Sequence, residues 1–284
     1  LKTEGLLVGK DPNEKFTYFV HIYNDSEKLL KLYETYPVLA RKLSVATSRH
    51  IDFISKLFSD LDESWGELHD SLLKGSRESS IVDIKLGQGD THEKGKSVVT
   101  IEFDKGRLVY KPRNLEVERI FDDVIEFFSA NPSFFEMRLV KSIYFKDFTV
   151  SEYIEQKGCD DEKQVAKYFT RYGQLLAIMY LLNGSDAHYE NIIANTEYPI
   201  IVDLETLFTN YVVFEGLSDT IPFKLIEEMR GSVTSSIMLP TNIQLDAHGN
   251  TADMSGLNGE GGVLSIKDYR PDDIETANAR FVLD

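Results

Sequence analysis

The stretch GSDAHYENIIANTEYPIIVDLET (184–206) surrounds a strongly apolar hairpin with polar residues. Two apolar runs flank NTEYP (195–199), a pattern that predicts two short strands joined by a tight turn. Folding such a hairpin brings its ends together, so we expect Asn191 and Asp203 to lie side by side. Asp186 should lie on the loop just before them. Ordinary loop polarity also produces such residues, but their spacing indicates a site.

The composition of the chain narrows its class. With 284 residues, 42% hydrophobic and 27% charged, it is typical of a soluble globular protein of one large or two modest domains. The apolar run LLAIMYLL (175–182) is too short for stable membrane insertion. A net charge of -16 argues against nucleic acid as a partner. The single cysteine, Cys159, excludes an intramolecular disulfide and a multi-cysteine zinc site, and favours the cytoplasm.

Residues 1–78 are expected to form a helical lead-in. Apolar residues recur at helical spacing between residues 26 and 74, and Pro37 should mark a break between helices. This region contains no group of residues that indicates chemistry.

From residue 81 the pattern changes to that of strands, namely IVDIKL (81–86), SVVTIEF (97–103) and RLVYK (107–111). The loop GQGDTHEKG (87–95) contains three glycines, and such a loop can lay backbone N–H groups over phosphates. Gly87 and Gly89 are therefore candidate cofactor-binding residues. Most glycine-rich hairpin loops are only turns, and this one lacks the full GxGxxG pattern. Asp90 and His92 are unusual residues for a simple turn.

Two helices and two further strands follow. Apolar residues from Val117 to Phe128 predict an amphipathic helix whose opposite, polar face carries Glu116, Glu118, Arg119, Asp122, Asp123 and Glu126. RLVKSIYF (138–145) and DFTVSEYI (147–154) predict strands, and a helix is expected over residues 161–182, with Phe169, Tyr172, Leu175, Leu176, Met179 and Leu182 on its apolar face. The predicted fold class is α+β. Residues 79–156 form a five-stranded antiparallel N-lobe with one helix, and residues 157–284 form a partial, mainly helical C-lobe.

The order of these parts resembles that of a protein-kinase-like phosphotransferase. In such enzymes a base aspartate precedes a metal-binding asparagine by five residues, the interval that separates Asp186 from Asn191. We expect Asn191 and Asp203 to hold Mg²⁺ on the phosphates of ATP, and Lys111 to bind phosphate oxygens. Asp186 would accept the proton of the attacking hydroxyl.

Longer motifs resemble a more specific family. The chain lacks the HRD and DFG motifs of ordinary protein kinases, and a generic small-molecule kinase does not combine YKPR with DLETLF. From about residue 15 to the end, the sequence resembles the dehydratase domain of type II lanthipeptide synthetases, the LanM family. The motifs that carry this resemblance are GDTHEKG (89–95), LVYKPRN (108–114), SDAHYEN (185–191), VDLETLF (202–208), SVTSSIMLP (232–240) and DMSGLNGEGG (253–262).

This resemblance implies dehydration of a ribosomal precursor peptide, leader plus core. The enzyme would phosphorylate Ser and Thr with ATP and Mg²⁺, then eliminate phosphate to leave dehydroalanine or dehydrobutyrine. The matching active-site positions are Lys111, Asp186, His188, Asn191, Asp203 and Glu205, with Asp90 and His92 in the glycine loop. Elimination needs a base and stabilisation of the departing phosphate. His188, Asp90, His92 and Glu205 act either in elimination or in holding the loops.

The family normally continues beyond this C-terminus, through more of the C-lobe and into a zinc-bearing cyclase domain. The chain also begins at Leu1 without methionine, so it resembles an internal fragment of a longer enzyme. Two alternatives stay open: a kinase-like phosphotransferase that stops at phosphorylation of a peptide or small molecule, and a non-catalytic peptide-binding scaffold. The glycine-rich residues 256–262 are expected to be mobile and to close over substrate.

Overall fold

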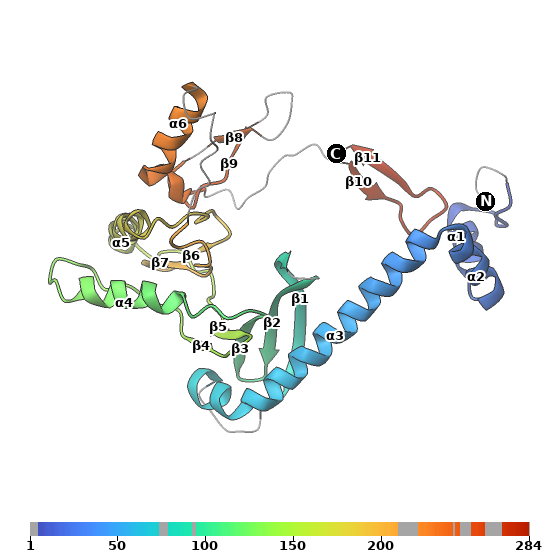
Figure 1. The fold of residues 1–284 in the computed structure, drawn as a ribbon, viewed down its shortest axis with the longest axis horizontal. Coiled ribbons are helices and arrows are strands. Elements are labelled where there is room, and N and C mark those ends of the chain that lie inside the picture. The colour runs from blue at the N-terminus through green and yellow to red at the C-terminus, as the bar shows by residue number, and fades with distance from the viewer. Residues whose placement is uncertain are drawn as a thin grey trace. The chain divides into compact units, whose positions relative to one another are not determined.

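The computed structural model describes residues 5–73, 79–92, 95–209, 221–240, 242–244, 251–258 and 269–283 (Figure 1). The chain divides into two compact units, Leu1–Ser55 with Ser265–Asp284, and Lys56–Leu264. The limits of these two units do not coincide with the domain boundaries predicted at residues 78/79 and 156/157. Those domain boundaries stay a prediction. Every predicted site residue belongs to the second unit.

The first unit is built from helices and one hairpin. Its elements are α1 (Pro12–Ile22), α2 (Ser26–Thr35), the first part of α3 (Pro37–Leu68), β10 (Tyr269–Asp272) and β11 (Arg280–Leu283). The carboxylates of Asp11 and Asp25 accept backbone N–H groups of the first turns of α1 and α2, so both helices begin with a capping residue. Pro37 separates α2 from α3, which confirms the predicted break. Among the described residues, no helix is long and apolar enough to cross a bilayer.

An antiparallel sheet forms one side of the second unit. Its strands are β1 (Ile81–His92), β2 (Lys96–Phe103), β3 (Gly106–Lys111), β4 (Ser142–Tyr144) and β5 (Thr149–Glu152), in the order β1-β2-β3-β5-β4. Helix α4 (Glu118–Ser129) connects β3 to β4. The predicted five-stranded antiparallel sheet with one helix after its third strand is therefore confirmed.

The predicted glycine loop is mostly strand. β1 continues through Gly87 and Gly89 to His92, so strand takes up residues 87–92 of the expected loop over residues 87–95. Gly87 has φ 70°, and the pairing of β1 with β2 shifts register between Lys85 and Gln88, which marks a bulge. Glycine permits this positive φ, and the strand resumes beyond the bulge.

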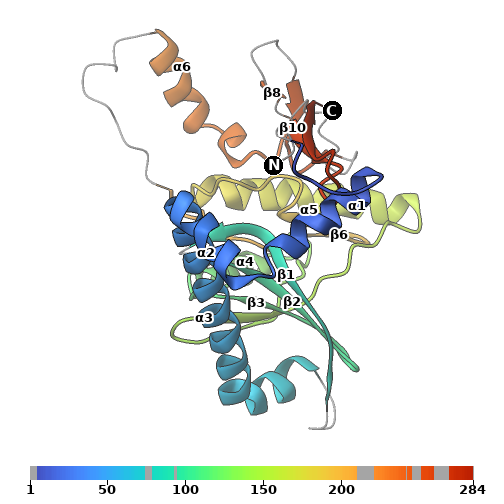
Figure 2. The same ribbon diagram turned by 90° about the vertical axis from the view of Figure 1, so that its right-hand side faces the viewer.

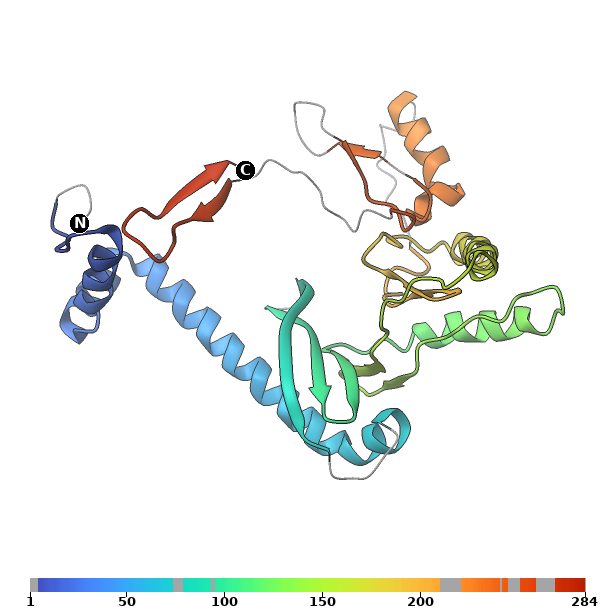
Figure 3. The ribbon, with the colours of Figure 1, turned by 180° about the vertical axis from the view of Figure 1, so that it is seen from behind.

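The second half of α3 packs on this sheet (Figure 3). It ends in a π-helical turn, His69–Leu73. The hydroxyl of Tyr110 on β3 donates a 2.8 Å hydrogen bond to the buried carboxylate of Asp60. The ring of Trp65 lies 5.4 Å from that of Phe103, measured between centroids. The helix therefore supports β3, the strand that ends at Lys111.

Helices and short hairpins follow the sheet. They are α5 (Glu162–Leu181), β6 (Ile192–Asn195), β7 (Tyr198–Ile201), α6 (Ile221–Arg230), a 3₁₀ turn (Val233–Ser236), β8 (Asn242–Gln244) and β9 (Thr251–Asp253). In Figures 1 and 2, α5 lies between the sheet and α6. The region predicted to be mainly helical therefore contains more strand than expected.

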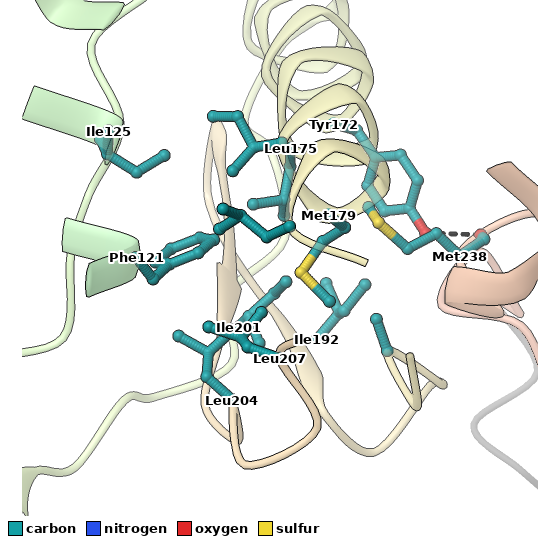
Figure 4. Close-up of a cluster of buried hydrophobic side chains, with 13 residues drawn as sticks. Phe121, Ile125, Tyr172, Leu175, Met179, Ile192, Ile201, Leu204, Leu207 and Met238 are labelled. Atoms are coloured by element: carbon teal, nitrogen blue, oxygen red, sulfur yellow. Dashed lines mark hydrogen bonds between the residues drawn. The ribbon is translucent and has the colours of Figure 1, made fainter. Parts of the chain in front are cut away.

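A cluster of buried apolar side chains joins α4, α5 and the β6–β7 hairpin (Figure 4). Contrary to the prediction, Phe169 on α5 is exposed, whereas Tyr172, Leu175 and Met179 are buried as expected. The hydroxyl of Tyr172 donates a 2.7 Å hydrogen bond to the carbonyl oxygen of Met238. The rest of the cluster is Phe121, Ile125, Ile178, Leu182, Ala187, Ile192, Ile201, Leu204 and Leu207. This core includes Ala187 and Leu204, which lie in the segments that carry Asp186 and Asp203.

Candidate active site

A cleft of about 430 Å³ lies between the sheet and the β6–β7 hairpin. The predicted residues Lys111, Asp186, His188, Asn191, Asp203 and Glu205 all line it, together with Arg113. The backbone of Asp90 and His92 lies on β1, but their side chains fall outside the described residues. The N–H of Gly87 donates to the hydroxyl of Ser97 at 3.0 Å, so it is already used within the sheet. Nucleotide binding by Gly87 and Gly89 stays a prediction.

Alternation of buried and cleft-lining residues builds the acidic side of the cleft. Ala187 is buried between Asp186 and His188, and Leu204 is buried between Asp203 and Glu205. The apolar members of each run anchor the backbone in the core, so their polar neighbours face the cleft. The packing therefore positions four cleft-lining side chains through two buried apolar residues.

The hairpin brings its two ends together as predicted. Ile192 pairs with Ile201, and the N–H of Val202 donates to the carbonyl oxygen of Asn191 at 3.0 Å. Asn191 thus lies opposite the residue that precedes Asp203. The side-chain amide nitrogen of Asn191, Nδ2, donates a 2.8 Å hydrogen bond to the backbone carbonyl oxygen of Asp186, which connects the loop to the hairpin.

The loop at Asp186 is held in an unusual conformation. Asp186 has φ 63°, a left-handed value that non-glycine residues adopt at a cost of about 1 kcal/mol or more. The N–H of Glu190 donates to Nδ1 of His188 at 3.2 Å. Nε2 of His188 lies 3.3 Å from Nδ2 of Asn191 and 3.6 Å from Oδ1 of Asp186. His188 therefore contacts Glu190 and Asn191 within this segment, and the choice between a loop-anchoring and a catalytic role stays a prediction.

Asn191 and Asp203 offer oxygen ligands for a divalent cation. Nδ2 of Asn191 is engaged with Asp186, so Oδ1 is the candidate ligand atom, and Asp203 supplies a carboxylate. Within the described residues, no group of three or more His, Cys, Asp or Glu is arranged to hold a metal. Mg²⁺ keeps several waters and often binds through one or two carboxylates plus substrate phosphates. One carboxylate and one amide oxygen therefore fit the few protein ligands that Mg²⁺ takes beside a phosphate.

Glu118 corrects the predicted polar face of α4. It is 7% exposed and accepts a 3.1 Å hydrogen bond from Nζ of Lys111. Nζ of Lys111 also donates to the carbonyl oxygen of Val202 at 2.6 Å, and the hydroxyl of Tyr144 donates to Glu118 at 3.2 Å. Burial raises the pKa of Glu118, and the attraction of Lys111 opposes that rise. Sequence reasoning missed Glu118, although a lysine expected in a cleft needs an acidic partner when it is buried.

Arg113 is a second residue that sequence reasoning missed. Its guanidinium lies 3.3 Å from Oδ2 of Asp203 and forms an ion pair with Glu205. The N–H of Glu205 donates to Oδ1 of Asp203 at 3.3 Å. Two carboxylates two residues apart at the end of one hairpin are a signal that a nearby cation is required.

The segment after β9 packs against the Asp186 loop. Ser255 forms an antiparallel bridge with His188, and the N–H of Tyr189 donates to the carbonyl oxygen of Met254 at 3.4 Å. A Cβ on Gly256 would lie 2.8 Å from the carbonyl oxygen of Ala187. The expected mobility concerned residues 256–262, of which 259–262 lie outside the described residues. Gly256 itself is closely packed.

The cleft thus combines two cations from the end of β3 with carboxylates, an amide and an imidazole from the hairpin region. The chain is 27% identical over 247 residues to the lacticin 481/lactococcin biosynthesis protein LcnDR2 of Lactococcus lactis subsp. lactis. That alignment covers 83% of this chain and 26% of LcnDR2, so the chain spans about a quarter of the relative's length. A family model described as a domain of unknown function, DUF4135, matches residues 36–284, and the chain belongs to that family.

Proposed function

We propose that this chain is the kinase-like dehydratase part of a lanthipeptide synthetase. It would bind Mg·ATP in the cleft, phosphorylate Ser and Thr of a ribosomal precursor peptide, and eliminate the phosphate. The observation that carries this proposal is the convergence of Lys111 with Asp186, Asn191 and Asp203 on one cleft. The similarity to LcnDR2, a protein named for lacticin 481/lactococcin biosynthesis, supports the substrate class.

The surroundings of Lys111 support the kinase-like assignment. Protein kinases pair a lysine on their third strand with a glutamate on the helix that follows, and both must be in place for phosphoryl transfer. Lys111 ends β3, and its partner Glu118 is the first residue of α4. The sheet order, with α4 between β3 and β4, is consistent with the same arrangement.

The first step would be phosphoryl transfer. Mg²⁺, when bound at Asn191 and Asp203, would neutralise charge on the ATP phosphates. Lys111, at the end of β3, lines the cleft and would donate to phosphate oxygens there. Asp186 would accept the proton of the Ser or Thr hydroxyl while the hydroxyl oxygen bonds to the γ-phosphorus, the bond from that phosphorus to the β-phosphate oxygen breaks, and ADP leaves. His188 would hold the Asp186 carboxylate in position.

The second step would be elimination. A base removes the Cα proton, a double bond forms between Cα and Cβ, and the Cβ–O bond breaks as phosphate leaves with the electron pair. Glu205 and His188 line the same cleft and are candidates for the base. Asp90 and His92 are proposed to assist from β1, whose backbone reaches His92.

The proposal includes partners and location. The precursor peptide would bind through leader and core, and a covalently linked cyclase domain would belong to the full-length protein. The proposed location is the cytoplasm, where ATP and newly made ribosomal peptides are available. No role in nucleic-acid binding is proposed.

The test is mass spectrometry of a Ser/Thr-containing precursor peptide incubated with the chain, ATP and Mg²⁺. Phosphorylation adds roughly 80 Da per site, whereas phosphorylation followed by elimination removes roughly 18 Da. We expect the mass loss with the wild type. With Asp186→Asn, the rate of modification should be lower by about 10²–10⁴-fold, so that most of the peptide stays unmodified. Asp147→Asn, an exposed change before β5, is the matched control.

The other outcomes identify the alternatives. Accumulation of phosphorylated peptide without mass loss would mean a phosphotransferase that stops at the first step. An unchanged peptide, with no binding of Mg·ATP to the folded chain by calorimetry, would mean a non-catalytic scaffold.

A further inference from the structure

Two cations enter the cleft from the segment LVYKPRN, and the proposed function uses one of them. Lys111 is buried against Glu118, whereas the guanidinium of Arg113 contacts both carboxylates beyond β7, those of Asp203 and Glu205. Asp203 is the proposed metal ligand. One of its oxygens faces Arg113 and the other accepts the N–H of Glu205.

The backbone of Arg113 is firmly held, so its side chain is the part that can move. The hydroxyl of the fully buried Thr149 donates to the carbonyl oxygen of Arg113 at 3.1 Å and accepts the N–H of Leu115 at 3.0 Å. The side chain of Asn114 donates to the carbonyl oxygen of Phe145 at 2.7 Å. The side chain of Arg113 is 21% exposed and has several rotatable bonds.

We propose that Arg113 is a phosphate-binding residue of the cleft, and that its guanidinium pairs with the carboxylates of the metal site until a ligand binds. Without ligand its guanidinium neutralises Asp203 and Glu205. When a divalent cation binds Asp203, the guanidinium turns to an oxygen of the bound phosphate. This inference rests on the proposed Mg·ATP site and adds a residue to it.

The chemistry of the groups supports this exchange. A divalent cation bound to Asp203 would lie within a few ångströms of the guanidinium, and the two positive charges would repel each other. The planar guanidinium presents paired N–H donors that match phosphate as well as carboxylate oxygens. The guanidinium of Arg113 can therefore pair with the carboxylates before a ligand binds and with the phosphate afterwards.

The experiment measures binding of Mn²⁺ alone, and then of ATP at saturating Mn²⁺, to the chain by calorimetry. Arg113→Gln removes the competing cation, so Mn²⁺ alone should bind about three- to tenfold more tightly than to the wild type. ATP should bind about tenfold more weakly, because a charge-assisted contact to phosphate is lost. Arg113→Lys should keep the metal affinity near that of the wild type and still weaken ATP binding, because lysine lacks the paired donors.

Arg280→Gln is the matched control, since Arg280 pairs with Asp272 through an exposed ion pair in the other unit. It should leave both affinities unchanged, and thermal unfolding of each variant verifies its fold. Unchanged or weaker Mn²⁺ binding by Arg113→Gln would overturn the inference, as would unchanged ATP binding, because it requires both effects. If the wild type binds neither ligand, the proposed function fails with it; if the wild type binds both and the variants match it, the inference alone fails.

Discussion

The two ion-pair regions on either side of Pro112 differ in depth. Lys111 and Glu118 join β3 to α4 with side chains that are 7% and 9% exposed. Arg113 joins the segment after β3 to Asp203 and Glu205 with side chains that are 21–33% exposed. Both regions border the same cleft. The Lys111–Glu118 pair is enclosed by protein, whereas solvent reaches Arg113 and its two carboxylate partners.

This difference in burial predicts different roles for the two ion-pair regions. Charges in a low-dielectric interior interact strongly, and removing one partner leaves the other without compensation. Partly exposed ion pairs are screened by water and contribute less to folding. We therefore expect the Lys111 region to hold the architecture of the cleft and the Arg113 region to change when ligand binds.

The largest expected effect tests that contrast directly. Lys111→Met should lower the free energy of unfolding by about 3 kcal/mol, because it leaves the buried Glu118 carboxylate unpaired. Arg113→Gln should lower it by less than about 1 kcal/mol, because the carboxylates it leaves are hydrated. Denaturant unfolding at neutral pH measures both changes.

A double variant verifies the cause. Adding Glu118→Gln to Lys111→Met removes both buried charges, so much of the lost stability should return. If the double variant is as unstable as the sum of the single variants, the two side chains do not act as a pair. Equal losses in Lys111→Met and Arg113→Gln would remove the distinction between the regions.

A second prediction sharpens the contrast from the hairpin side. Gly256→Ala places a methyl group 2.8 Å from the carbonyl oxygen of Ala187, in the loop that carries Asp186. We expect a loss of about 2 kcal/mol, because backbone as well as the side chains of Tyr172 and Ile192 must shift. Unfolding measurements give the loss, and Mg·ATP calorimetry reports the displaced loop.

Gly173→Ala on α5 is the matched control, since a Cβ there meets no atom within 4 Å. It should raise stability by about 0.5–1 kcal/mol, because alanine favours helix more than glycine does. Wild-type stability in Gly256→Ala would mean that the segment after β9 yields easily, as the expected mobility of residues 256–262 implies.

Local patterns predicted most of the second unit's architecture. The five strands, α4, α5 and the β6–β7 hairpin follow from periodicity and turn residues, and the six predicted side chains described at the cleft meet there. The continuation of β1 beyond Gly87 was missed, because polar residues and glycines imitate a loop while pairing with β2 decides the outcome. Phe169 was assigned to the buried face because helical spacing does not define how wide that face is.

The missed site residues were missed for a different reason. Glu118 has the spacing of a solvent-facing residue on α4, and its burial depends on Lys111, seven residues earlier on another element. Arg113 follows a proline outside regular structure, so no periodicity marks it. Ion pairs between distant elements are properties of the packed molecule, and a single sequence does not encode them locally.

The smallest expected effect concerns a third carboxylate beside the buried pair. Asp122 lies one turn after Glu118 on α4. Burial, and then the negative charge of Glu118, raise the pKa of Asp122 to about 6. Between about pH 4 and pH 6 the folded chain therefore holds a proton that the unfolded chain releases, so this group's contribution to stability is full below that window and is lost as pH rises through it.

Asp122→Asn removes that loss. The variant should match the wild type near pH 3.5 and exceed it by about 1 kcal/mol above pH 6, a value reduced from the full shift because the side chain is half-buried. Unfolding free energies measured between pH 3.5 and 7.5 give the difference. A gain of equal size at both ends would mean that the substitution acts through packing. A gain confined to the upper range would mean that α4 accepts the buried charge of Glu118 because Lys111 balances it, whereas ionisation of Asp122 beside that pair costs stability.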